Sequence, residues 1–444
     1  MKRILVIGAG RTSTSLINYL ISKSIEQDWF ITVADQSLDL AKQKSGNHPR
    51  VKAVKFNILN EKERSAHITK ADIVASLLPE THHIHLVKDC LLHRVHLVTA
   101  SYVSSQMESF NERASSSGLI FLNEMGLDPG IDHMDTLRLI NKIKNKGGQL
   151  ISLRSFGGGL IAPENDDNPW GYKITWNPMN VVIAGMASAR YVKDGKLKIV
   201  PYNRLFLDVH RVEVPGVGTL EAYPNRDSIK YRRIYHATKI PNVFRGSLRK
   251  PGFCEAWQAL VQIGLTDNRY IVPDAHKLTY EEWLSFYLDK KNNRTIKKTL
   301  ANFLNVTEES EIIKKIKWLG LLSDDKIGLT DPTPADILLD LLQKKWKFSK
   351  TDKDMVILQT EVEYLIDEAK EKIVSTLVLY GKENYNTAMS ETVGLPMGVG
   401  VNLILNNKIS ERGVIIPIYP DIYKPALKEL AKMGIVFKEK LTKF

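Results

Sequence analysis

The chain contains few cysteines and no long apolar run. Only two cysteines, Cys90 and Cys254, occur in 444 residues, and they lie far apart. This count excludes a disulfide framework or a cysteine-rich metal cage and favours a reducing compartment. No apolar run approaches the roughly 20 residues that span a bilayer, and the N-terminus does not resemble a signal peptide. These absences predict a cytoplasmic protein with no membrane partner.

Several common catalytic motifs are also missing. The sequence contains no G-x-S-x-G elbow, no P-loop and no H-E-x-x-H, which excludes the common hydrolase and NTPase classes. Three histidines cluster at His82, His83 and His85. Zinc sites, however, normally combine three or four converging ligands, often with a carboxylate or cysteine. We therefore predict no metal site.

Positive charge is in excess, with a net charge of +12 and a pI of about 9.3. The lysines are scattered along the chain without interleaved aromatic residues or a known nucleic-acid motif. A solvated basic surface that attracts an anionic cofactor and substrate is therefore favoured over nucleic-acid binding.

The start of the chain has the pattern of a dinucleotide-binding β-α-β unit. An aliphatic run over residues 4–7 enters a turn with Gly8 and Gly10, a helical pattern follows, and a second strand ends on Asp35. Gly8 would form the tight turn, Gly10 would admit a pyrophosphate at the helix N-terminus, and Asp35 would accept hydrogen bonds from a ribose. Ser13 replaces the third glycine of the motif.

The remaining pattern predicts an α/β fold: a Rossmann-type doubly wound parallel sheet plus a mixed-sheet substrate domain with a helical insertion. The last segment has one helical face interrupted by Pro396, and we expect it to pack on the first domain. Expected local elements include a helix over 105–114 and strands over 172–176 and 205–212. The expected domains are 1–126 with about 386–444, 127–250 with about 351–385, and the insertion 251–350.

One loop at the predicted ligand edge of the sheet stands out. Pro129 keeps Asp128 out of helical geometry, and Gly126 and Gly130 permit sharp turns on either side. A carboxylate there is placed to meet a substrate amine. The alternative is that Asp128 only caps the following helix, but Asp132 already suits that first turn. We favour the functional interpretation.

Two arginines are expected in a turn or at a strand end and not on the solvated face of a helix. Arg226 is in a Pro-Asn turn and Arg249 is at a strand end. Arginines bind carboxylates through two parallel hydrogen bonds, so this pair suits a substrate with several carboxylates. The alternative for Arg226 is an internal ion pair with Asp227.

Four motifs together resemble the saccharopine reductase family, the L-glutamate-forming saccharopine dehydrogenases. They are T-A-S-Y-V-S at 99–104, N-E-M-G-L-D-P-G-I-D-H at 123–133, A-Y-P-N-R-D-S at 222–228 and R-G-S-L-R at 245–249. With the glycine turn, the resemblance implies a cofactor site of Gly8, Gly10, Arg11, Thr12, Asp35, Gln36, Asn57, Ile58, Leu77, Ala100, Ser101, Leu127, Asp128, Pro129 and Trp176. It implies a saccharopine site of Ser101, Tyr102, Asp128, Arg226, Ser247, Leu248 and Arg249.

The resemblance also implies a reaction and an assembly. Hydride leaves the carbon beside the secondary amine of saccharopine for NAD or NADP, and water then splits the imine into L-glutamate and aminoadipate semialdehyde. Asp128 or Tyr102 would assist the amine or the water, and which of them is the general base stays open. A homodimer is implied, and the physiological direction within lysine metabolism is not fixed by the sequence.

Two departures from the family pattern bear on these expectations. Fungal NADP-dependent members place an uncharged residue and then arginine where this chain has Asp35 and Gln36, so we expect a preference for NAD. The family's cysteine before a glycine pair is Gly157 here. The alternatives are a carboxynorspermidine or opine dehydrogenase, or a non-catalytic NAD-binding regulator.

Overall fold

The computed structural model describes residues 1–289, 295–384 and 386–444. The chain forms two compact units, Met1–Leu150 with Lys353–Phe444, and Ile151–Asp352. The first unit therefore contains both ends of the chain. The three-part division expected from the sequence stays a prediction.

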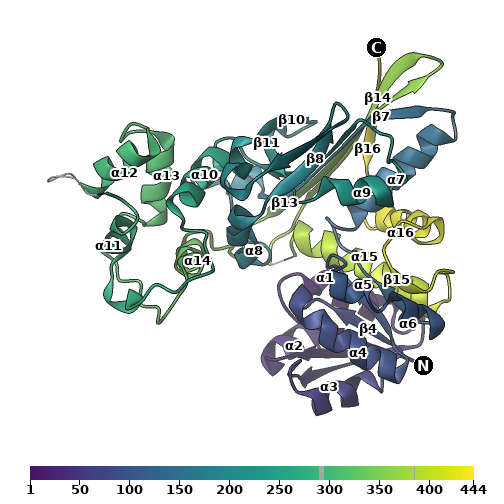
Figure 1. Ribbon diagram of the computed structural model, residues 1–444. Helices are drawn as coiled ribbons and strands as arrows, with labels where there is room; N and C mark the ends of the chain where they lie inside the picture. Colours follow the sequence, from purple (N-terminus) through teal and green to yellow (C-terminus); the bar gives the residue numbers. More distant parts are fainter. Residues whose placement is uncertain (290–294, 385) are drawn as a thin grey trace. The chain divides into compact units, whose positions relative to one another are not determined.

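The first unit contains a parallel seven-stranded sheet in the order β15-β6-β5-β4-β1-β2-β3 (Figure 1). Strand order reverses beside β1, which is the doubly wound arrangement predicted from the sequence. The strands are β1 (Lys2–Ile7), β2 (Trp29–Asp35), β3 (Val51–Lys55), β4 (Ile73–Ser76), β5 (His96–Thr99), β6 (Ile120–Leu122) and β15 (Gly413–Ile415).

Helices cover this sheet because its strands are apolar on both faces. Leu5 and Ile7 of β1 join a core with Leu86 of α4, while Ile4 and Val6, which alternate with them, are equally buried. Such continuous apolar strands are typical of parallel sheets buried on both sides. The flanking helices include α1 (Ser13–Lys23), α2 (Leu38–Ser45), α3 (Glu61–Ile68) and α4 (His83–His93).

The helix expected over 105–114 is two short helices, α5 (Ser105–Glu108) and α6 (Asn111–Ser116). Each helix has its own N-cap residue. Ser104 caps α5 through its side chain, whereas Phe110 precedes α6 without a side-chain cap. The single-helix prediction was therefore wrong in this detail.

Helix α15 (Ala388–Leu405) packs against α1, as the sequence predicted for the C-terminal segment. Pro396 lies inside this helix and does not end it, which corrects the expected interruption. By length and composition α15 is apolar enough to cross a membrane, but 72% of it is buried inside the protein. That burial is what a core helix of a folded domain shows.

The first unit also contains an antiparallel set of strands, β13 (Asp354–Ile366), β14 (Ala369–Tyr380) and β16 (Lys438–Lys443). β13 and β14 form an antiparallel hairpin. Helix α7 (Ile131–Lys144) packs against β13 and against α16 (Pro420–Lys432).

The second unit contains a mixed sheet. β12 (Asn242–Arg249) pairs in parallel with β7 (Gln149–Ile161) and antiparallel with β11 (Gly218–Pro224), which pairs with β10 (His210–Val214). A hairpin of β8 (Ala189–Lys193) and β9 (Lys196–Val200) adjoins β12.

One expected strand of this unit is not a strand, and a second is a strand only in its last part. Residues 172–176 have no regular secondary structure, and the first part of 205–212 is a 3₁₀ helix, η4 (Tyr202–Leu207), before β10 begins at His210. Tyr172 and Ile174 are instead buried by tertiary packing. Their apolar character therefore reflects burial in a core and not strand pairing.

The predicted helical insertion consists of α10 (Phe253–Ile263), α11 (Tyr280–Ser285), α12 (Ile296–Leu304), α13 (Glu311–Leu319) and α14 (Pro334–Lys345). Its inner faces meet in an aromatic core. The rings of Trp257 and Trp346 stack 5.8 Å apart, and Trp170 meets both edge-on. Phe253, four residues after the end of β12, stacks on Trp257 at 5.4 Å. The aromatic core therefore adjoins the C-terminal end of β12.

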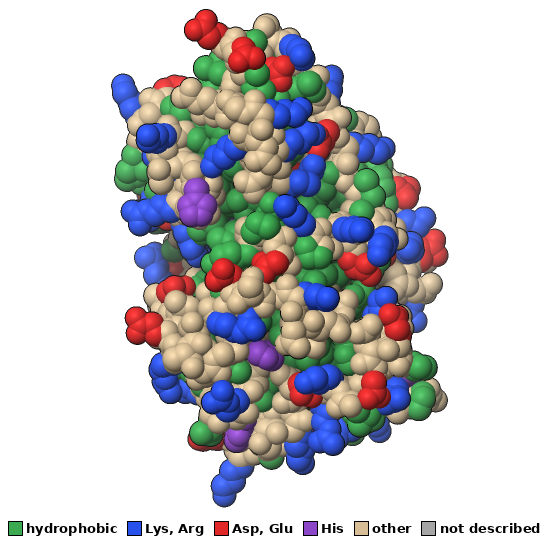
Figure 2. Space-filling model, turned by 90° about the vertical axis from the view of Figure 1, so that its right-hand side faces the viewer, with side chains coloured by type: hydrophobic (Ala, Val, Ile, Leu, Met, Phe, Trp, Pro, Cys, Tyr) green, Lys and Arg blue, Asp and Glu red, His purple; other side chains and the backbone are tan. Residues whose placement is uncertain are grey.

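The positive charge is dispersed on one face of the protein. On the face drawn in Figure 2, Lys and Arg side chains alternate with acidic, apolar and uncharged ones. Dispersed charge of this kind keeps a surface solvated without forming a single binding stripe.

Candidate active site

The carboxyl ends of the parallel strands lie at one edge of the seven-stranded sheet. Six of the loops at this edge contain residues that the sequence singled out. They are the turn 8–12 after β1, Asp35 at the end of β2, Asn57 and Ile58 after β3, Leu77 after β4, the loop 100–103 after β5 and the loop 123–130 after β6. Because the strands are parallel, these loops share one edge of the sheet.

The glycine turn has the backbone that a dinucleotide requires. Gly8 has φ of +101°, and its N–H donates to the Ala34 carbonyl over 2.9 Å. A Cβ placed on Gly10 would meet no heavy atom of the described residues within 4 Å. The hydroxyl of Ser13 donates to the Gly10 carbonyl over 2.8 Å. Serine at the third glycine position therefore stabilises the turn, and Gly10 leaves space for a pyrophosphate.

Backbone groups hold Asp35 at the end of β2. Oδ2 accepts from Ala9 N–H over 2.7 Å, and Oδ1 accepts from Ser37 N–H over 2.8 Å. The carboxylate is half-buried, while Gln36 beside it is exposed. A fixed negative charge thus adjoins the glycine turn, where the ribose of a bound dinucleotide is expected.

The other cofactor candidates of this edge differ in environment. Leu77 packs against the turn, since a Cβ on Gly8 would lie 3.4 Å from the Leu77 Cβ. Asn57 is exposed and Ile58 is buried. The Ile58 carbonyl accepts from Arg64 over 2.8 Å. Arg11 is exposed and Thr12 is half-buried at the start of α1.

The loops after β5 and β6 bring Tyr102 and Asp128 together. The Tyr102 hydroxyl donates to Asp128 Oδ1 over 3.1 Å, and both side chains are half-buried. The two loops pack closely, because a Cβ on Gly126 would lie 3.0 Å from the Ala100 Cβ. Ser101 donates its N–H to Thr99 Oγ1 over 3.1 Å.

Asp128 is not the cap of the helix that follows. Gly130 occupies the N-cap position of α7, and its N–H donates to Asp132 Oδ1 over 2.6 Å. Leu127 and Pro129 are buried on either side of Asp128. The loop therefore exposes its carboxylate partly and buries its apolar neighbours, which is the arrangement that a polar ligand contact needs.

His83, one of the three clustered histidines, lies next to Thr99 at the end of β5. It is buried, and burial lowers the pKa of its imidazole to about 4. Its ring nitrogens lie 3.4 and 3.5 Å from Thr99 Oγ1. No group of three or more histidine, cysteine or acidic side chains that could hold a metal ion occurs among the described residues.

In the second unit, Arg249 is a buried cation inside an aromatic cage. Its side chain is 6% exposed, and its Cζ lies 5.2 Å from the ring centroids of Tyr172 and Phe253 and 5.5 Å from that of Tyr223. Nη1 donates to the Leu248 carbonyl over 2.7 Å and Nη2 to the Tyr223 hydroxyl over 3.3 Å. Nε has no hydrogen-bond partner among the described residues.

Glu221, the acidic residue opposite Arg249, accepts hydrogen bonds from backbone groups. Glu221 of β11 is paired with Arg249 in the strand register. Its carboxylate accepts from the N–H groups of Gly252 and Cys254 over 2.8 and 3.2 Å. Arg249 thus keeps its charge without an ion-pair partner among the described residues, which is unusual for a buried guanidinium.

The remaining candidates of the second unit have distinct positions. Arg226 is exposed, with φ of +48°, and its carbonyl accepts from Arg190 N–H over 2.9 Å. The described ion pair of Asp227 is with Arg190, over 2.6 Å. Ser247 is half-buried and Leu248 is buried on β12.

Trp176 is linked to the aromatic cage. Its indole N–H donates to the Tyr172 hydroxyl over 3.0 Å, and burial raises the pKa of Tyr172. A residue expected at the cofactor thus contacts a residue that touches Arg249. Sequence reasoning did not assign roles to Tyr172, Tyr223 or Phe253, because only the tertiary fold brings them to Arg249: Tyr223 lies on β11, Phe253 begins α10, and Tyr172 lies in an irregular segment.

Comparison with known proteins agrees with this geometry. Residues 4–122 match the model of the saccharopine dehydrogenase NADP binding domain, and residues 126–435 match that of the saccharopine dehydrogenase C-terminal domain. The chain belongs to the L-glutamate-forming saccharopine dehydrogenase family. It is therefore an oxidoreductase-family protein with an NAD(P)-binding domain.

Relatives of this saccharopine dehydrogenase family member cover its full length. It is 33% identical to the Saccharopine dehydrogenase [NADP(+), L-glutamate-forming] of Pyricularia oryzae and also 33% identical to that of Saccharomyces cerevisiae, with 99% of each chain covered. The apo structure of the Saccharomyces cerevisiae enzyme matches all of both chains at 32% identity with a TM-score of 0.86. The NAD complex of a homospermidine synthase from Legionella pneumophila, 12% identical with a TM-score of 0.57, shares the fold alone.

Proposed function

We propose that this protein interconverts saccharopine with L-glutamate and aminoadipate semialdehyde, using a nicotinamide dinucleotide. The full-length relatives that act on saccharopine support this reaction. So do the four sequence motifs, whose residues occupy the sheet edge of the first unit and, in the second, the strand β12 and the end of β11 with the turn that follows it.

The burial of Arg249 without a described ion-pair partner is the observation that most strongly supports a carboxylate-bearing substrate. A buried guanidinium without a carboxylate partner carries a desolvation penalty of several kcal/mol. An anionic ligand that binds there would offset it through charge-assisted hydrogen bonds. We assign Arg249 and Arg226 to the carboxylates of saccharopine. Ser101, Ser247 and Leu248 are assigned to the walls of the saccharopine site.

The Tyr102–Asp128 pair is the candidate for proton handling. A bound nicotinamide accepts or donates the hydride. Beside it, Asp128 would accept a proton from the secondary amine, or orient water, while Tyr102 holds the carboxylate through its hydroxyl. Which of the two is the general base remains open in this proposal.

We further propose a preference for NAD over NADP. The carboxylate of Asp35 is fixed beside the glycine turn, and a negative charge there repels a 2′-phosphate. The named relatives use NADP(+), so this chain would differ from them. A homodimer is proposed from the family resemblance. A cytoplasmic location is proposed because both cysteines are free thiols.

Replacing Arg249 tests the substrate assignment. We expect Arg249→Met to lower kcat/KM for saccharopine about 100-fold, which corresponds to the loss of charge-assisted hydrogen bonds. The affinity for NAD, measured by fluorescence titration, should stay within about twofold because the cofactor site lies on other residues.

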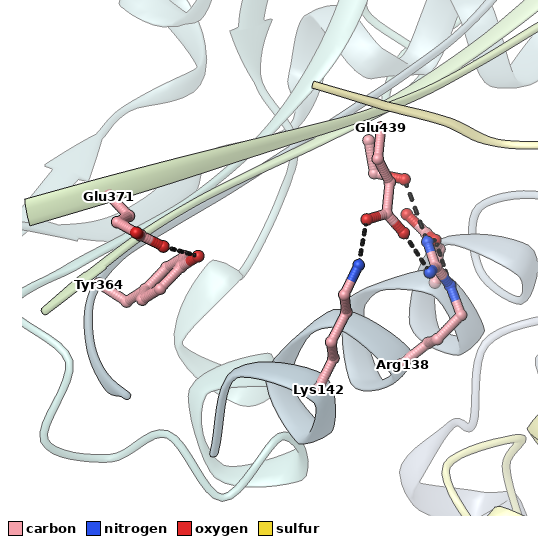
Figure 3. Close-up of polar contacts among 7 residues, drawn as sticks. Arg138, Lys142, Tyr364, Glu371 and Glu439 are labelled. Atoms are coloured by element: carbon pink, nitrogen blue, oxygen red, sulfur yellow. Dashed lines mark hydrogen bonds and ion pairs between the residues drawn. The ribbon is translucent and has the colours of Figure 1, made fainter. Parts of the chain in front are cut away.

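Arg138→Met is the matched control. The guanidinium of Arg138 already pairs with Asp135 and Glu439 (Figure 3), so its loss should leave the saccharopine kinetics nearly unchanged. Equal kinetics for the Arg249 and Arg138 variants would refute the assignment of Arg249 to a substrate carboxylate.

A further inference from the structure

Glu124 and His133, on either side of Asp128 in the sequence, form a fully buried hydrogen-bonded pair. Glu124 Oε2 is 2.8 Å from His133 Nε2, and both side chains are 0% exposed. Glu124 is in the loop after β6, and His133 is in the first turn of α7. Sequence reasoning placed both in one motif but gave neither a role.

Glu124 binds the neighbouring loop through its side chain and its backbone. Oε1 accepts from Val103 N–H over 3.0 Å. The Glu124 N–H donates to the Ser101 carbonyl over 3.1 Å, and the Met125 N–H donates to the Thr99 carbonyl over 3.0 Å. The residue that precedes Val103 is Tyr102, so these bonds fix the backbone on both sides of Tyr102.

His133 ties the same carboxylate to the other end of the Asp128 loop. Its Nδ1 lies 3.7 Å from Asp132 Oδ2. Asp132 Oδ1 accepts from Gly130 N–H over 2.6 Å, which holds the backbone two residues after Asp128. One chain of contacts therefore runs from Val103 through Glu124, His133 and Asp132 to Gly130.

Such a network is costly to bury. Several ionisable groups removed from water carry a penalty that apolar side chains of similar volume would avoid. The network joins the two backbone segments that carry Tyr102 and Asp128 and so fixes their relative position. The Tyr102 hydroxyl lies 3.1 Å from Asp128 Oδ1. Displacements of about 1 Å in such a pair can lower a rate about 100-fold.

We propose that Glu124 and His133 are positioning residues that hold Tyr102 against Asp128 by clamping the 99–103 loop to the 124–130 loop. They do not touch substrate and act through the pair that they position. The activity part of this proposal rests on the proposed function, whereas the structural part does not.

The first test compares Glu124→Ala with Glu124→Gln. Alanine removes the described contacts of the carboxylate with Val103 and His133. Glutamine keeps an oxygen for Val103 N–H and an amide that reaches His133. We expect Glu124→Ala to lower kcat for saccharopine oxidation 10- to 100-fold with the KM for NAD within about twofold, and Glu124→Gln to recover most of that loss.

Amide hydrogen exchange gives a readout that is independent of saccharopine. The Val103 amide should exchange faster in Glu124→Ala and remain protected in Glu124→Gln. If the wild-type protein does not oxidise saccharopine, the proposed function fails, and this exchange measurement still decides whether the clamp exists.

Asp135→Asn supplies the matched control. Asp135 is also buried on α7, but its carboxylate pairs with Arg138 over 2.5 Å, and Arg138 contacts Glu439 of β16 (Figure 3). This variant loses a buried charge without touching the 99–103 loop, so Val103 exchange and kcat should stay at wild-type values.

The proposal is overturned if folded Glu124→Ala matches the Asp135→Asn control in both kcat and Val103 exchange. Should Glu124→Ala fail to fold, His133→Gln replaces it, because it weakens the hold on Glu124 while leaving Oε1 on Val103. We expect faster Val103 exchange and a lower kcat in His133→Gln, and wild-type values for both would equally overturn the proposal.

Discussion

At the scale of single residues, backbone N–H groups hold the important carboxylates in place. Asp35 accepts two such bonds at the end of β2, Glu124 accepts one from Val103, and Asp132 accepts one from Gly130. Hydrogen bonds from backbone groups fix the direction of a carboxylate more firmly than mobile side chains do. Each of these carboxyl groups is therefore held in a fixed orientation.

Asp35 is expected to decide between the two cofactors. Asp35→Asn removes the charge that opposes a 2′-phosphate, and one amide oxygen still accepts a backbone N–H. We expect the ratio of kcat/KM for NADP to that for NAD to rise about tenfold, or about 1.4 kcal/mol.

The control is Asp39→Asn, since Asp39 is exposed in the first turn of α2 and no described contact joins it to the glycine turn. Its cofactor ratio should equal that of the wild type. A wild-type enzyme that already prefers NADP, or an unchanged ratio in Asp35→Asn, would disprove the role of Asp35.

Residues of the cofactor turn could be predicted because their signal is local. Gly8, Gly10 and Asp35 lie within one β-α-β unit, and parallel strands align their ends at one edge. The cage around Arg249 could not be predicted. Its rings come from segments that are distant in sequence, and Tyr172 lies in a stretch whose pattern indicated a strand that the structure does not contain.

At the scale of elements, helix α15 supports the cofactor turn. Asp354 accepts from the N–H groups of Ala388 and Met389 over 2.6 and 2.9 Å, and burial raises the pKa of its carboxyl to about 6. The hydroxyl of the next residue, Ser390, donates to the Thr12 carbonyl over 3.3 Å. The C-terminal part of the chain thereby fixes the start of α1.

Gly394 allows α15 to approach α1 closely. A Cβ there would lie 2.6 Å from the Leu16 backbone nitrogen and 3.2 Å from the Thr12 carbonyl oxygen. We expect Gly394→Ala to lower the free energy of unfolding by about 1–3 kcal/mol through overpacking, and to weaken NAD binding because α1 must move. Urea unfolding and fluorescence titration of NAD measure the two effects.

Gly400→Ala on the same helix is the control. It gains the same helix propensity, and its Cβ would meet only the ends of the flexible side chains of Leu122 and Met125, at 3.2 and 3.3 Å. Equal stability and NAD affinity for the two variants would show that the close approach at Gly394 is unimportant.

The packing of the C-terminal segment on the first domain was predicted from its apolar face, whereas the continuity of α15 was not. Proline inside a helix removes one hydrogen bond and normally bends or ends it. Here α15 is buried over most of its length, so tertiary packing outweighs the local preference at Pro396. Local sequence patterns do not report such packing.

At the scale of the whole molecule, each unit carries residues that the proposed function needs, a cofactor edge in the first and a buried cation in the second. Family membership and full-length relatives support one chemistry for both. The first unit offers the glycine turn and the Tyr102–Asp128 pair, and the second offers the buried cation Arg249. A non-catalytic NAD-binding protein would have no need of that cation.

The most direct test of the central claim is a spectrophotometric assay of the purified protein with saccharopine and either NAD or NADP, with product identification by mass spectrometry. The account predicts saccharopine-dependent formation of the reduced cofactor, more efficient with NAD, together with L-glutamate and aminoadipate semialdehyde in equal amounts. Binding of NAD without any saccharopine-dependent reduction of either cofactor would contradict it.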